Sequence, residues 1–133
     1  MRYLLDTNIL IYAIKHKPRQ VYAKLMARKP EDVCISVITF AELIHGCEKS
    51  KSPEHNKAVL MQMLANIEVL DFDATAAYEY GKIKADLETK GTTIGSMDAL
   101  IAGHARSLNC VLVTNNTREF ARVKDLQIEN WAE

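Results

Sequence analysis

The sequence predicts an α/β fold of three layers, α/β/α, in which helices cover both faces of a central parallel sheet of four to five strands. Short apolar runs alternate along the chain with longer segments of helical period, and strands separated by helices form parallel sheets. The 133 residues contain no internal repeat and no linker rich in Pro, Gly or Ser. Residues 1–133 are therefore expected to form one domain.

The first half of the chain is expected to begin with two strand–helix pairs. The apolar runs at residues 2–5 and 32–36 predict buried strands, and residues 9–16 and 38–49 have the apolar spacing of helices. Pro53 is tolerated in the first turn of a helix, so Ser52 and Pro53 indicate the start of a third helix, which runs to about residue 66.

The second half continues the alternation. Residues 68–72 predict a third strand, after which Asp73 is the expected N-cap of a long helix that reaches about residue 89. Gly91 suits the position that ends this helix, and Ser96 is the expected N-cap of a helix over residues 97–108. The remaining elements are expected to be a strand at 110–114, a short helix at 117–121 and an edge strand at 126–131.

Composition and charge exclude several classes of protein. No apolar run reaches the roughly 20 residues of a membrane span, which predicts a soluble protein without a membrane partner. The three cysteines Cys34, Cys47 and Cys110 form no CxxC pair, so we expect reduced packing residues and a cytoplasmic protein. Net charge is zero, but residues 1–30 hold seven basic side chains and one acid. This basic segment either attracts phosphates or forms a solvated helix face.

Polar side chains stand where two predicted strands end. Asp6 directly follows apolar residues, and a carboxylate there must be hydrogen-bonded, protonated or bound to a cation. It could equally serve only as the N-cap of the next helix. Thr114, Asn115 and Asn116 end a later strand, where they either form a turn or add oxygen atoms to the same edge. Ligands of parallel sheets bind at this edge, which makes both groups candidates.

Two further acids lie in predicted helices. Glu42 follows Thr39 at the spacing of a capping box, in which the Glu reaches back to the cap amide. If Ser36 caps the helix instead, Glu42 lies beyond the first turn and can point across the carboxyl edge of the sheet. Asp98 lies in the first turn of its helix, where the helix dipole alone would favour it. The apolar residues 99–102 that follow indicate a buried helix whose N-terminus faces a cleft.

The combination of these groups is more informative than any one of them. Asp6, Asp98 and Asn116 each sit just past a strand or at a helix start, which places them on one rim of the sheet. Clustered carboxylates raise one another's pKa unless a cation offsets the repulsion. Oxygen ligands without histidine or thiolate suit Mg²⁺ or Mn²⁺ better than zinc. Such clusters typically activate water for phosphodiester cleavage.

Four short segments follow one another along the chain: Leu5-Asp6-Thr7-Asn8, Ala41-Glu42-Leu43, Asp98-Ala99-Leu100-Ile101-Ala102 and Thr114-Asn115-Asn116. Together they resemble the signatures of the PIN-domain family and, within it, the VapC toxins of bacterial VapBC toxin–antitoxin pairs. The resemblance covers essentially the whole chain, and residues 112–120 and 129–131 are particularly similar to VapC. It implies a PIN-like form of the α/β/α fold.

The resemblance also implies an activity, that of an endoribonuclease dependent on Mg²⁺, with Mn²⁺ as a substitute. Asp6, Glu42 and Asp98 would hold one or two metal ions and act as catalytic residues. Asn116 matches a further catalytic position that many family members fill with Asp, so here it offers a neutral oxygen. Glu79 lies near where some toxins place an additional acid.

Partners follow from the same resemblance. The substrate would be a structured RNA, foremost a tRNA, cut to inhibit translation. VapC-like proteins are usually homodimers, and form hetero-oligomers with a cognate VapB-type antitoxin whose C-terminal segment fills the active-site groove. An antitoxin arginine would reach the acidic cluster. The apolar side chains of Ile11, Tyr12 and Ile14 either accept the antitoxin or belong to the core.

Other classes of protein account for the sequence less well. A response-regulator-like receiver needs an adjacent acidic pair after its first strand, and a haloacid-dehalogenase phosphatase needs Asp-x-Asp, whereas Asn8 follows Thr7 here. A non-catalytic RNA-binding PIN module would not need three clustered acids. A PIN nuclease of RNA processing that is not a toxin remains an alternative. The four histidines, including His104, show no metal-ligand spacing.

Overall fold

Five parallel strands form one sheet at the centre of the computed structural model, which describes residues 1–133. They are β1 (Tyr3–Leu5), β2 (Val33–Ser36), β3 (Glu68–Leu70), β4 (Val111–Val113) and β5 (Ile128–Glu129), in the spatial order β3-β2-β1-β4-β5. The first strand, β1, is central, with Leu4 in register with Cys34 of β2 and Leu112 of β4. The predicted parallel sheet is confirmed, and β5 is the expected edge strand, shorter than predicted.

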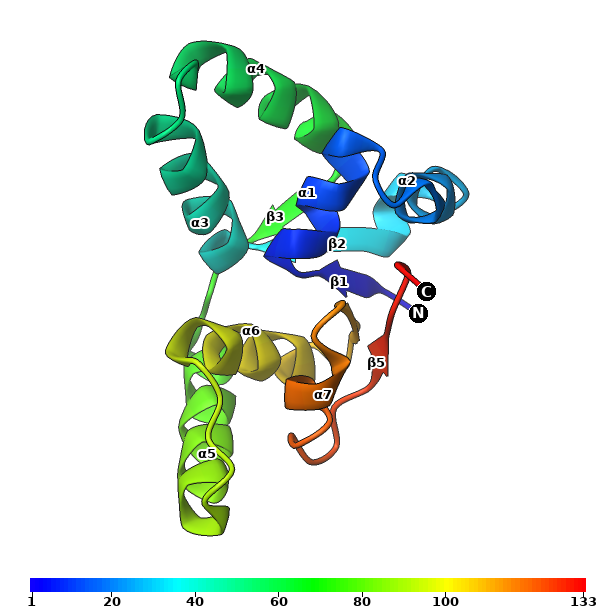
Figure 1. Ribbon diagram of the computed structural model, residues 1–133. Helices are drawn as coiled ribbons and strands as arrows, with labels where there is room; N and C mark the ends of the chain where they lie inside the picture. Colours follow the sequence, from blue (N-terminus) through cyan, green and yellow to red (C-terminus); the bar gives the residue numbers. More distant parts are fainter.

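Helices connect the strands and cover both faces of the sheet. They are α1 (Thr7–Lys15), α2 (Arg19–Met26), α3 (Val37–Glu48), α4 (Pro53–Met63), α5 (Ala74–Lys90), α6 (Ser96–Ser107) and α7 (Thr117–Phe120). Two short 3-10 turns, η1 (Pro30–Asp32) and η2 (Leu64–Asn66), precede β2 and β3. Figure 1 shows α1, α3 and α4 on one side of the sheet and α5 and α6 on the other. The predicted three layers are therefore confirmed.

Alternation along the strands divides the apolar core into two clusters. The strand residues of the cluster on the side of α1 and α4 include Leu5, Ile35 and Val113. Those of the cluster on the side of α5 and α6 include Leu4, Cys34 and Leu112. All six side chains are fully buried. Because both faces are covered, the strands read as continuous apolar runs rather than as alternating ones.

The ends of α5 and α6 test the predicted caps. Asp73 is the N-cap of α5 and accepts a hydrogen bond of 2.9 Å from the Ala76 amide, as predicted. Gly91 ends α5 with a φ of 67°, a left-handed conformation that glycine adopts without steric cost. The predicted N-cap of α6 is wrong by one residue, because the helix already begins at Ser96 and Gly95 is the capping position.

The helix α2 is absent from the elements predicted by sequence. It has eight residues and buries only Val21 and Leu25, while most of its other side chains are polar. Pro18 precedes it and offers no side-chain cap. Two buried positions in one short segment are too few to reveal the apolar period of a helix in the sequence. Tertiary packing rather than the local pattern therefore defines this helix.

The helices α5 and α6 pack with their backbones in contact at Gly103. A Cβ atom added to Gly103 would lie 2.7 Å from the backbone nitrogen of Tyr80 and 2.8 Å from its Cα. No real Cβ atom tolerates such distances to backbone. Glycine is therefore required here, and it sets how closely α6 and the acid in its first turn approach the rest of the fold.

The three cysteines are free, as expected from their number and spacing. Cys34 and Cys110 are buried in the cluster on the side of α5 and α6, and Cys47 packs against the other cluster. None of the helices combines the length and the hydrophobicity that crossing a bilayer requires.

Candidate active site

Asp6 stands directly after the central strand, and its carboxylate is also the N-cap of α1. It accepts a hydrogen bond of 2.9 Å from the Ile9 amide and is only 9% exposed. Burial raises the pKa of Asp6, and the charges of Asp98 and Glu42 raise it further. Hydrogen bonds from the Thr114 hydroxyl and the Ile9 amide act in the opposite direction. Asp6 thus caps a helix and also faces two other carboxylates.

Glu42 projects from α3 and is held by the residue after Asp6. The Thr7 hydroxyl donates a hydrogen bond of 2.7 Å to Oε1 of Glu42. The capping box with Thr39 is wrong, because Ser36 caps α3 by accepting a hydrogen bond of 3.0 Å from the Ile38 amide. Glu42 therefore lies beyond the first turn of α3, in the position that lets its carboxylate face the carboxyl edge of the sheet.

Asp98 lies in the first turn of α6, where the helix dipole stabilises a negative charge. Burial nevertheless raises the pKa of Asp98, and the charges of Glu119 and Glu42 raise it further. The three carboxylates named from sequence, on Asp6, Glu42 and Asp98, therefore interact electrostatically with one another.

A fourth carboxylate, Glu119 of α7, was not identified from the sequence. It is the larger of the two charges that raise the pKa of Asp98. The missed signal is its spacing: an acid three residues after Asn116, in the first turn of a helix that begins beyond a strand end. Asn116 donates a hydrogen bond of 3.2 Å from Nδ2 to Oε2 of Glu119. Its side chain therefore orients this acid, and its own catalytic role stays a prediction.

The four carboxylates fit a hard divalent cation by their chemistry, since all four donors are oxygen atoms. No three acidic, histidine or cysteine side chains lie close enough together in this structure to share one ion. Burial and, after it, repulsion among the carboxylates raise the pKa of Asp6 and of Asp98, and Glu42 is engaged by Thr7. A cation would offset that repulsion.

Two other residues considered from the sequence lie outside this cluster. Glu79 of α5 pairs with Arg106, whose Nε lies 2.7 Å from Oε1, and this hydrogen bond lowers the pKa of Glu79. Its charge is therefore already balanced. His104 is 2% exposed, and its Nδ1 lies 2.8 Å from the Ser36 hydroxyl. It supports the packing of α6 against the end of β2 and contacts none of the four carboxylates.

Comparisons with known proteins decide the family. The model described as "PIN domain" matches residues 3–126. The chain belongs to the PIN-domain family. It is 47% identical over 132 residues to the "tRNA(fMet)-specific endonuclease VapC" of Shigella flexneri, which covers 99% of both chains. It is 45% identical over 131 residues to the "Ribonuclease VapC" of Haemophilus influenzae, with 98% of both chains covered.

A solved structure gives the same result for the fold of this PIN domain. The crystal structure of DNA-bound VapBC from Salmonella typhimurium superimposes with a TM-score of 0.92 at 46% sequence identity, over 98% of both chains. The family resemblance drawn from the four sequence segments is thus confirmed, and the chain is of the VapC type within its family.

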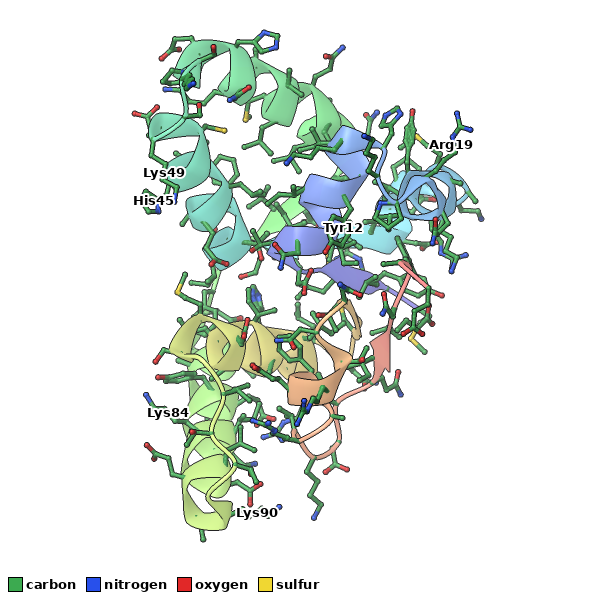
Figure 2. All side chains as sticks on the ribbon, viewed as in Figure 1. Tyr12, Arg19, His45, Lys49, Lys84 and Lys90 are labelled. Atoms are coloured by element: carbon green, nitrogen blue, oxygen red, sulfur yellow. The ribbon has the colours of Figure 1, made fainter.

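A groove of about 320 Å³ lies beside Glu42 in this PIN domain, between α1, α3 and α4. Glu42 stands in its wall, and the rest of the lining is mostly apolar, with Ile11, Ile14, Leu43 and Leu60 among its members. Ile11 and Ile14 also pack against the core, which confirms the core interpretation, and contact with an antitoxin stays a prediction. Tyr12, labelled in Figure 2, is not part of this groove; its hydroxyl accepts a hydrogen bond from Asn115 instead.

Proposed function

We propose that this PIN domain, residues 1–133, is a Mg²⁺-dependent endoribonuclease that acts as the toxin of a toxin–antitoxin pair. The observation that carries the proposal is the set of carboxylates on Asp6, Glu42, Asp98 and Glu119, which influence one another's charge at the carboxyl edge of the sheet. Close relatives bear the names of VapC ribonucleases, which supports RNA as the substrate.

Asp6, Glu42 and Asp98 would hold the Mg²⁺, or Mn²⁺ in its place, with Glu119 beside them. When bound, the cation supplies Lewis-acid stabilisation of the charge that develops on the scissile phosphate. The chain's own contribution is orientation: Ile9 and Thr114 hold Asp6, and Thr7 holds Glu42. These contacts orient the two carboxylates, and binding of the cation would draw the ligands together.

A structured RNA, specifically a tRNA, is the proposed substrate, cut to inhibit translation in the cytoplasm. The relative from Shigella flexneri is named for an activity on tRNA(fMet), and 47% identity over nearly the whole chain supports a substrate of the same class. A nuclease of RNA processing would share the same site. Growth arrest on expression distinguishes the two, because only a toxin stops growth without its partner.

A VapB-type antitoxin is the proposed inhibitor, and a homodimer the proposed state of the free toxin. The VapBC complex of Salmonella typhimurium supports such a partner. The groove between α1, α3 and α4 offers an apolar floor that ends at Glu42, which suits an amphipathic segment with a basic residue for the carboxylates.

The decisive experiment is cleavage of purified tRNA by the purified protein with Mg²⁺, with Mn²⁺ and with EDTA. Asp6→Asn and Asp98→Asn should each abolish cleavage, whereas Glu88→Gln, a change of the same kind on an exposed part of α5, should have no effect. Undiminished cleavage in EDTA would refute the metal dependence. Unimpaired growth of cells that overproduce the active enzyme would refute the role as a toxin.

A further inference from the structure

Arg28, just after α2, has a guanidinium without an anionic partner. It lies over two rings that contact each other, 4.7 Å from the centroid of Tyr3 and 5.2 Å from that of Trp131. Its Nε is buried and has no hydrogen-bond partner, and no carboxylate forms an ion pair with it. The aromatic rings therefore fix a cation whose hydrogen-bonding capacity is unused.

A cavity of about 560 Å³ lies beside this guanidinium, between the C-terminal ends of α1 and α2 and the end of α4. Its floor is aliphatic, with Leu25 and Val33 among its members. Polar groups stand around it, namely Arg28, His16, Tyr22, Gln62 and Asn66. None of its lining residues is acidic.

Ile14 and Val59 line both this cavity and the groove beside Glu42, so the two hollows adjoin. Glu42 is the only acid in the two linings and has Lys15 in the same wall, and the Arg28 cavity forms the positive end. The positive end lies in the part of the chain where residues 1–30 hold seven basic side chains and one acid. A segment that fills the whole length would meet opposite charges at its two ends.

A carboxylate fits the Arg28 end better than an RNA phosphate does. A planar guanidinium binds a carboxylate through two parallel hydrogen bonds, and the aliphatic floor accommodates the stem of an acidic side chain and its apolar neighbours. A guanidinium can also bind a phosphate in this way, but a ribose–phosphate backbone has no apolar stem to place on the aliphatic floor. Arg19, labelled in Figure 2, is exposed on α2. Arg28 is half-buried.

We propose that the Arg28 cavity binds an Asp or Glu side chain of the antitoxin. This inference rests on the proposed function, and it specifies the antitoxin's charge pattern: a basic residue for the Glu42 end of the groove and an acidic residue for the Arg28 end. The two charges fix the direction in which the segment lies along the groove. A reversed segment would place like charges together at both ends.

The test uses the wild-type toxin and the antitoxin expressed from the same operon. Arg28→Gln should raise the Kd of the complex by at least about tenfold, and the matched variant Arg19→Gln should leave it unchanged. One Asp→Asn or Glu→Gln change in the antitoxin should weaken binding equally. Combining that change with Arg28→Gln should cause little further loss, because the two remove the same contact.

Each outcome has a defined meaning. Arg28 packs on Trp131, so its substitution can affect folding, and thermal unfolding of the variants is measured alongside the Kd. If Arg28→Gln folds poorly, the antitoxin substitutions still test the inference, because they leave the toxin unchanged. The inference would be overturned if Arg28→Gln left the Kd of the complex unchanged. It would also be overturned if the loss of affinity from Arg28→Gln added fully to the loss from the substitution of every acid in the antitoxin. A rise in the KM for RNA that matches the loss of antitoxin affinity would likewise overturn the inference, since it would assign the cavity to RNA. A wild-type protein that cuts no RNA and binds no antitoxin would instead overturn the proposed function.

Discussion

The hydroxyl of Thr7 lies 2.7 Å from Oε1 of Glu42 and donates a hydrogen bond to it, which links the first residue of α1 to the middle of α3. The contact joins residues 35 positions apart in sequence. The hydrogen bond fixes the rotamer of Glu42, whose carboxylate has no hydrogen-bond partner within α3. Thr7, which is not among the proposed metal ligands, thereby orients one of them.

Removal of this hydrogen bond should weaken metal binding without unfolding the protein. Thr7→Val keeps the size and β-branching of the side chain but deletes the donor. We expect the Mg²⁺ concentration for half-maximal cleavage to rise about tenfold or more, the usual effect of losing a contact that orients a ligand. Thr7→Ser retains the donor and should stay near wild type. Equal Mg²⁺ requirements for Val and Ser would show that the contact has no such role.

The fourth carboxylate can be distinguished from its neighbour by paired substitutions. Glu119→Gln removes a charge that acts on Asp98, whereas Asn116→Ala removes only the amide that orients Glu119. Cleavage by Glu119→Gln should fall at least about 100-fold, as expected for a group that acts electrostatically at the reacting centre, and cleavage by Asn116→Ala only severalfold. A larger loss for Asn116→Ala than for Glu119→Gln would assign the catalytic role to the asparagine.

The repulsion among the carboxylates should make the metal-free protein less stable than its neutralised variant. Asp98→Asn removes a half-buried charge that faces Glu119 and Glu42, so its Tm without metal should rise by roughly 3 °C or more. Mg²⁺ should raise the Tm of wild type but not that of Asp98→Asn. Glu88→Gln, on an exposed turn of α5, should resemble wild type in both measurements. A lower Tm for metal-free Asp98→Asn would mean that the carboxylate stabilises the fold.

The contact between α5 and α6 can be tested with two glycines in helices. Gly103→Ala would place a Cβ 2.7 Å from the Tyr80 nitrogen and should destabilise the fold by about 1–3 kcal/mol. Gly81→Ala, in the interior of α5, has no atom within 4 Å of the added Cβ. It should stabilise by about 0.5–1 kcal/mol, because alanine favours helices. Urea unfolding measures both, and destabilisation by similar amounts would refute the argument from packing.

His104 should make the folded state sensitive to acid. Burial lowers the pKa of His104 below its ordinary value, although the charge of Asp73 and a hydrogen bond to the Asp71 carbonyl oppose this. A lowered folded-state pKa means that the stabilisation is present above the unfolded-state pKa and is lost as pH falls through the folded-state pKa. His104→Asn should therefore lose less unfolding free energy than wild type between pH 7 and pH 5. Parallel pH profiles would contradict the assignment.

Much of the fold follows from local patterns in the sequence. The strand runs are apolar because both faces of the sheet are covered, and Asp73 and Gly91 mark the ends of α5 through their own hydrogen bonds and backbone conformation. The helix α2 could not be predicted, since only Val21 and Leu25 tie it to the core. The position of the cap of α3 depended on Ser36 rather than Thr39, a choice that two plausible local motifs left open.

The candidate site was predictable in part for a related reason. Asp6, Glu42 and Asp98 lie in segments whose apolar flanks show where strands and helices meet, and this indicates a shared edge. Glu119 lies in a four-residue helix whose direction depends on the preceding turn, so its proximity to Asp98 becomes evident only in three dimensions.

The order of the strands has a consequence for folding of the protein. Tyr3 of the central strand pairs with Val111 and packs its ring 5.5 Å from that of Trp131, which is 2% exposed. These contacts join segments far apart in the sequence, and contacts of that kind slow folding because a long loop must close first. The sheet is therefore expected to be completed late in refolding, after the local helices have formed.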